Sequence, residues 1–225
     1  MLARRRVKLA AVAAGAMTML AGCGFHPGAA AVVGSQTITR EEVDDVAQAF
    51  CSAQLASAKA ANQPAPTVPT RAAREAALQF LLEADIYQQF GKQEGVEANP
   101  QQVSQVVAQQ AGGLEVLPKH EQQVLRSALH DYAEGRLMLL EVGRQAAGAQ
   151  ASESQAMSAG NQMLVKYVKK LDVEVDPRYG AFENGTFKRG GASLSVAASD
   201  EARAGDKEQP DQSFVAQLPA SQQCR

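Results

Sequence analysis

The chain of 225 residues contains no tryptophan, and aromatic residues make up only 5% of it. A large sheet core normally draws on many aromatic and β-branched residues, whereas the alanine, leucine and glutamine that are abundant here are good helix formers. We therefore expect packed helices rather than a large sheet. Histidine and cysteine are also scarce, with three residues of each, which limits the metal and nucleophilic sites that the chain can build.

The spacings typical of common catalytic and metal sites are absent as well. The sequence has no His-Glu-x-x-His and no Cys-x-x-Cys, the patterns that gather ligands around zinc. A hydrolase needs a nucleophile and a base that converge, but His26 lies in the tether, and His120 and His130, ten residues apart on one predicted helix, lie on roughly opposite sides of it. The acidic residues are scattered and are expected to lie on solvated faces. We expect no catalytic residue, no cofactor and no metal site.

The N-terminal segment has the organisation of an export signal. Four cations, Arg4, Arg5, Arg6 and Lys8, precede an apolar run that ends at Leu20. This run is too short to span a bilayer, which takes about 20 apolar residues. A basic start, a short apolar core and small residues at a cut site are typical of secretory signals.

The sequence that follows this core, Leu20-Ala21-Gly22-Cys23, resembles the lipobox of bacterial lipoproteins. The resemblance implies cleavage before Cys23, acylation of its thiol, and lipid anchoring (diacylglycerol, and a palmitate-like chain) on the extracytoplasmic face of the cell membrane. The alternative is an ordinary signal peptide with a chance cysteine near the cut.

Removal of the signal peptide changes the charge of the chain. Residues 1–22 hold four cations and no acid, so the formal charge falls from -2 to -6. A mildly acidic exported protein is a poor candidate for binding nucleic acid, which calls for a basic face. We divide the remainder into a tether at residues 23–29, a helical domain at residues 30–187 and a low-complexity tail at residues 188–225. The tail has no sustained apolar period and is expected to be mostly disordered.

Two cysteines remain besides Cys23, and an oxidising external space favours their pairing. We predict a disulfide between Cys51 and Cys224 that ties the end of the tail to the first helix. The alternative is two free thiols, with Cys51 as a small buried residue.

Start and stop signals predict about five helices between two short extended regions. Capping boxes are predicted by the spacing of Thr39 with Glu42, Asn99 with Gln102 and Ser152 with Gln155, and Pro100 at the first helical position is a further start signal. The predicted helices cover approximately residues 39–59, 70–91, 99–111, 118–148 and 152–171.

Extended segments are predicted at both ends of this helical region. Residues 31–33 and 37–38 flank a Gly-Ser turn, and residues 172–176 alternate polar and apolar side chains. Because short strands are unstable alone, we expect the two ends to pair as a small two-stranded clasp, in a fold that is otherwise mainly α.

The segment from Val32 to Val43 resembles the opening of the SurA and PrsA family of extracytoplasmic chaperones, and the segment from Val173 to Gly180 resembles the strand that closes their chaperone region. The resemblance implies a SurA N-terminal-like domain that holds unfolded or partly folded exported proteins. Many members of the family also carry a parvulin-type prolyl isomerase domain. No segment of this chain resembles that domain, so we expect no isomerase activity.

Such a domain would cover the apolar side chains of a client with its own. The candidate client-binding residues are Phe80, Phe90, Leu137, Met138, Met157 and Met163. The alternative for each residue is packing in the core, because a client-binding groove and a core both require apolar side chains at the same helical periodicity. Two other functions stay open: a structural or adaptor lipoprotein with one fixed envelope partner, and a diverged enzyme related to the prolyl isomerases.

Overall fold

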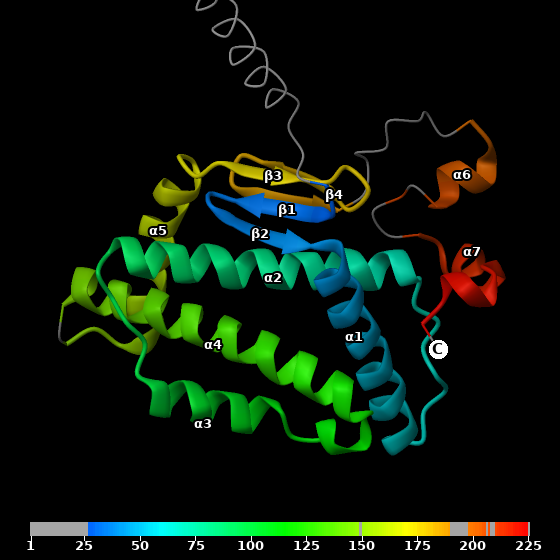
Figure 1. Ribbon diagram of the computed structural model, residues 1–225, viewed down its shortest axis with the longest axis horizontal. Coiled ribbons are helices and arrows are strands. Elements are labelled where there is room, and N and C mark those ends of the chain that lie inside the picture. The colour runs from blue at the N-terminus through cyan, green and yellow to red at the C-terminus, as the bar shows by residue number, and fades with distance from the viewer. Residues whose placement is uncertain (1–26, 149, 190–197, 206, 208–209, 225) are drawn as a thin grey trace, which may run out of the picture.

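A computed structural model describes residues 27–148, 150–189, 198–205, 207 and 210–224 (Figure 1). The predicted signal peptide, the lipidation site Cys23 and most of the predicted tether lie outside the described residues. So does His26.

The described chain is mainly helical, as predicted. Its main helices are α1 (Arg40–Ala60), α2 (Thr70–Gln93), α3 (Pro100–Gln110), α4 (Lys119–Ala147) and α5 (Glu153–Val168), with the short 3₁₀ helix η1 (Leu114–Val116) before α4. These bounds lie within a few residues of the predicted ones because helix ends depend on local cap chemistry.

The predicted caps are formed, but only one of them is a complete capping box. The Ser152 hydroxyl accepts a hydrogen bond from the Gln155 backbone N–H, and the Gln155 side chain accepts one from the Ser152 N–H. At Thr39 the hydroxyl accepts from the Glu42 N–H at 3.1 Å, without a return bond from the Glu42 side chain. Asn99 likewise caps α3 without a return bond. The capping boxes predicted at Thr39 and Asn99 are therefore only half formed.

The two ends of the helical domain meet in an antiparallel sheet, as predicted. Strands β1 (Ala29–Val33), β2 (Gln36–Thr39) and β3 (Val173–Val175) lie in the order β2-β1-β3, so the clasp has three strands rather than two. Val32 lies opposite both Thr37 and Glu174. The sheet lies over α2, with β1 in its centre (Figure 1).

A second hairpin was not predicted. It consists of β4 (Gly180–Glu183) and β5 (Thr186–Arg189), in which Phe182 lies opposite Phe187. Its turn residues Asn184 and Gly185 both have positive φ, 54° and 80°. Asn-Gly is the preferred pair for such a turn, so this signal was present in the sequence.

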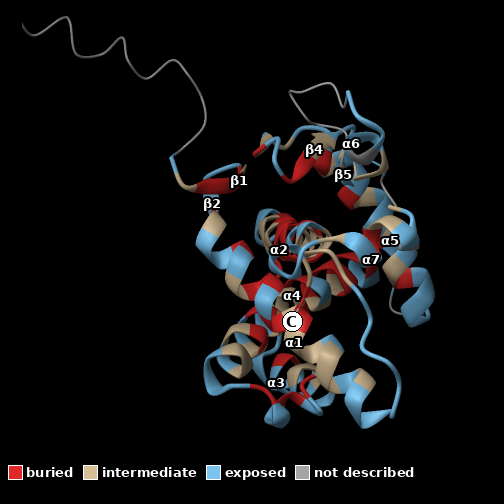
Figure 2. Cartoon of the chain, turned by 90° about the vertical axis from the view of Figure 1, so that its right-hand side faces the viewer, coloured by how far each residue is buried: buried red, intermediate tan, exposed pale blue. Residues whose placement is uncertain are grey.

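Helix α2 forms the centre of the hydrophobic core, between the sheet and α4 (Figure 2). The largest fully buried side chains are Phe90, Leu78, Leu82, Met138, Leu139, Val33 and Val43. Two of the predicted client-binding residues, Phe90 and Met138, are buried in this core, with 1% and 2% of their surfaces exposed. They face inward because their helices α2 and α4 pack against each other.

Helices α4 and α5 pack closely through glycine. A Cβ built at Gly143 would overlap the Ala156 carbonyl, and one built at Gly160 would lie 2.5 Å from the Leu139 carbonyl oxygen. The missing side chains let the two backbones approach each other.

The described part of the tail is more ordered than predicted. It contains α6 (Asp200–Gly205), α7 (Gln212–Gln217) and the 3₁₀ helix η2 (Ala220–Gln222). The predicted disulfide between Cys51 and Cys224 is present, and both residues are buried in the main core. Val215 is also buried. The burial of Val215 and the disulfide of Cys224 hold the end of the tail against the domain, which composition does not reveal.

Candidate binding site

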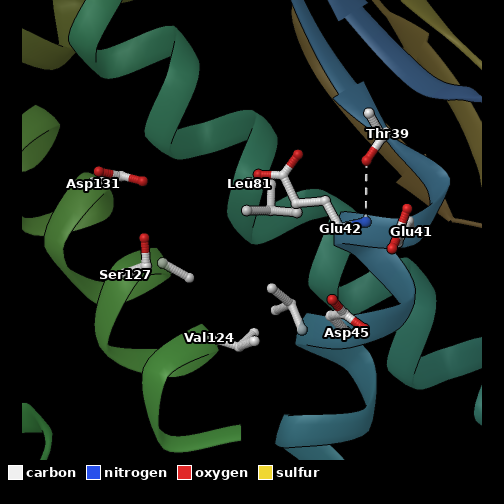
Figure 3. A pocket seen from close by; sticks show the side chains of 10 residues that line it. Thr39, Glu41, Glu42, Asp45, Leu81, Val124, Ser127 and Asp131 are labelled. Carbon is white, nitrogen blue, oxygen red and sulfur yellow. Dashed lines mark hydrogen bonds between the residues drawn. The ribbon is translucent and has the colours of Figure 1, made fainter. Parts of the chain in front are cut away.

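A pocket of about 330 Å³ opens between α1, α2 and α4 (Figure 3). Its lining combines acidic, hydroxyl and apolar side chains. The lining residues are Thr39, Glu41, Glu42, Asp45, Val46, Leu81, Val124, Ser127, Ala128 and Asp131.

The apolar part of the lining comes from all three helices. Val46 of α1, Leu81 of α2 and Ala128 of α4 are buried, and Val124 is half-buried. They recur at helical spacing, Val124 and Ala128 being one turn apart, so each helix presents an apolar side to the others. This packing fixes the floor of the pocket.

The acidic part of the lining comes from two helices that are distant in sequence. Thr39 caps α1 and places Glu41, Glu42 and Asp45 in its first turns. Asp131 reaches the pocket from the middle of α4, on the opposite side (Figure 3). The sequence analysis missed the site because these acids meet only when α1 packs beside α4.

The carboxyl groups around the pocket influence one another. Partial desolvation raises the pKa of Glu42; the backbone N–H of Thr39, which faces the carboxyl group, lowers this pKa, and the charge of Asp131 raises it. Asp85, nearby on α2, has its pKa raised to about 6, chiefly by burial and then by the charges of Glu42 and Asp131, while Lys92 acts in the opposite direction. The site therefore carries negative charge that is only partly balanced.

A wider and shallower groove of about 550 Å³ lies on α5. It is lined by Ser154, Met157, Ser158, Asn161, Gln162 and Val165. The Val165 side chain is unusually accessible for a valine, with 56% of its surface exposed. Of the six client-binding candidates, only Met157 lines this groove.

The other candidates lie between core and surface. Phe80 is half-buried and stacks on Tyr132 with ring centroids 4.6 Å apart, and its edge meets Phe50. Leu137 is half-buried, and Met163 is half-buried against the main core. The structure does not bring the six residues together on one surface.

One group of side chains has the composition of a metal site. His130, Asp131 and Glu134 place possible ligand atoms within 4.8 Å of one another. The three residues come from adjacent turns of one helix, and the first two are exposed. Such an arrangement leaves the rest of a coordination shell to water, so it does not by itself define a metal site.

Within the described residues, no helix is both long enough and apolar enough to cross a membrane. Comparison of the chain with protein-family models, with curated proteins and with solved structures gives no match.

Proposed function

We propose that this protein is anchored by a lipid on Cys23 to the extracytoplasmic face of the cell membrane, where it holds unfolded or partly folded exported polypeptides without catalysing a reaction. The observation that carries the proposal is the groove on α5, where Val165 is 56% exposed and Met157, half-buried against the main core, also contributes to the lining. The resemblance of the two ends of the domain to SurA and PrsA chaperones supports the same function.

The physical basis is the burial of apolar surface. An unfolded client exposes apolar side chains, and covering them is favourable by roughly 25 cal/mol per Å². Methionine suits such a surface because its side chain adapts its shape to different partners. A protein that binds the unfolded form keeps it from aggregating and needs no reactive centre.

The test is an aggregation assay with residues 24–225, which include every residue that the structure describes. At near-stoichiometric amounts the protein should suppress aggregation of several unrelated unfolded proteins. Protection of none of them would favour the adaptor lipoprotein with one fixed partner. A rate above background in a proline-isomerisation assay on a short peptide would contradict the absence of catalysis.

A matched pair of variants locates the binding surface. Met157→Ser combined with Val165→Ser should reduce protection, since both side chains line the groove. Val116→Ser should leave protection unchanged, because Val116 is 72% exposed but belongs to η1 and not to the groove. An equal loss in both variants would mean that the α5 groove is not the binding surface.

A further inference from the structure

We propose that the pocket between α1, α2 and α4 takes the side chain of a lysine or arginine in a client segment, beside the apolar residues that the client presents. This inference rests on the proposed function and names one chemical feature of the clients. It is carried by the shape of the pocket and by the separation of its lining into an apolar floor and an acidic rim.

The floor suits the stem of a long cationic side chain. Val46, Leu81 and Ala128 are buried, so the floor is rigid and mostly apolar. Lysine and arginine lay their methylene chains along apolar surface while the charged group reaches a polar one. The volume of about 330 Å³ is at the lower end of the range for ligand pockets, and so fits one side chain rather than a folded partner.

The rim suits the charged end. Among the described residues, neither Glu41 nor Glu42 takes part in a salt bridge. Among the residues that the structure describes, the ion-pair partner of Asp45 is His120, at 3.8 Å, and that of Asp131 is His130, at 3.4 Å. No lysine or arginine of the described part of the chain lines the pocket, so a cation from outside would complement its charge.

Helix stabilisation explains part of this charge but not all of it. Acids in the first turn of a helix are favoured by the helix dipole, which accounts for Glu41 and Glu42 at the start of α1. It does not account for Asp131, which lies in the middle of α4 and completes the rim from the other side. The mutual repulsion of Glu42, Asp85 and Asp131 would be relieved by a bound cation.

The test uses three fluorescent peptides with one apolar sequence that differ at a single position, where they carry arginine, glutamine or glutamate. Residues 24–225 should bind the arginine peptide about five- to tenfold more tightly than the glutamine peptide, and the glutamate peptide most weakly. The preference should shrink in high salt, because partly exposed charges are screened.

Variants assign the preference to the pocket. Glu42→Gln with Asp131→Asn should abolish the preference for the arginine peptide over the glutamine peptide. The matched control, Glu94→Gln with Asp172→Asn, makes the same change in net charge at exposed acids outside the pocket and should keep the preference.

The outcomes separate this inference from the proposed function. Equal binding of all three peptides, or loss of the preference in the control variant as well, would overturn the cation pocket while the chaperone function stands. Binding of none of the peptides, together with no protection in the aggregation assay, would overturn both.

Discussion

Cys224 is disulfide-bonded to Cys51 of α1, 173 residues earlier in the chain, with the two Cα atoms 5.2 Å apart. The Cys224 N–H also donates a hydrogen bond to the Val68 carbonyl at 2.8 Å, and Gln223 forms an isolated bridge with Pro69. The end of the tail therefore lies against the segment that leads into α2, and the covalent bond and the backbone contacts hold it at the same place.

Removing this disulfide should destabilise the protein. Cys51→Ala combined with Cys224→Ala should lower the free energy of unfolding by about 2–4 kcal/mol, because a very long loop is no longer closed in the unfolded chain. Denaturant unfolding measures the change. As a control, wild-type protein in reductant should unfold like the variant, and the variant should not respond to reductant. Identical unfolding of oxidised and reduced wild-type protein would show that the bond adds no stability.

Cysteines placed at Val32 and Glu174 should form a disulfide, because these residues lie directly opposite each other in β1 and β3. The pair is introduced together with Cys51→Ala and Cys224→Ala, so that no other thiol of residues 24–225 competes. Peptide mapping after air oxidation should find a high yield of the new bond. Cysteines at Ser35 and Glu174 are the control and should give a low yield, since Ser35 lies in the turn beyond β1. Equal yields would argue against the observed strand pairing.

Gly143→Ala should lower the free energy of unfolding by about 1–3 kcal/mol, since its Cβ would overlap the Ala156 carbonyl and force α5 away from α4. Gly112→Ala is the control, because a Cβ there meets only the Gln109 carbonyl oxygen, at 3.8 Å. Thermal melts of both variants check the difference. A Gly143→Ala melt that coincides with the wild type would mean that the two helices do not pack so closely.

Asp85→Asn should change how stability depends on pH. The pKa of Asp85 is raised from 3.8 to about 6 in the folded protein, so between these values the folded state holds a proton that the unfolded state has lost. The stability due to this group therefore falls as the pH rises from about 4 to 6. Because Asp85 is only partly buried, solvent screening reduces the free-energy difference that the pKa shift implies. The variant should therefore be about 1 kcal/mol more stable than the wild type at pH 8.

The two proteins should become similar in stability as the pH falls below 3.8, where Asp85 becomes protonated in the unfolded state as well as in the folded state. Unfolding curves across the pH range make the comparison, and Asp172→Asn serves as the exposed control. A variant that is less stable than the wild type at pH 8 would contradict the predicted sign.

Cys23→Ala in the full chain should move the protein from the membrane fraction to the soluble fraction, since the thiol is the expected point of lipid attachment. Fractionation of the producing bacteria, followed by mass spectrometry of the N-terminal peptide, makes the measurement. A Cys51→Ala variant should stay with the membrane. Tight membrane association of the Cys23→Ala protein would refute anchoring through this residue.

Local chemistry is the part of this protein that its sequence determined. Thr39, Asn99 and Ser152 cap helices where their spacing predicted, because a cap depends on backbone groups only two or three residues away. The same holds for the Asn184-Gly185 turn, whose signal was present although the hairpin was not predicted. The clasp and the Cys51–Cys224 bond were also predicted, since few strands and few thiols left few possible pairings.

Tertiary packing determined which apolar residues are buried and which side chains share a site, because a helical period shows that a face is apolar but not what covers it. Phe90 and Met138 are fully enclosed in the core, whereas Met157, on a similar apolar stripe, packs against the core and also lines a groove; the difference arises from the positions of α2, α4 and α5. Glu42 and Asp131 share a pocket only because α1 packs beside α4. Residues that are distant in sequence come together through tertiary contacts, which no local sequence pattern predicts.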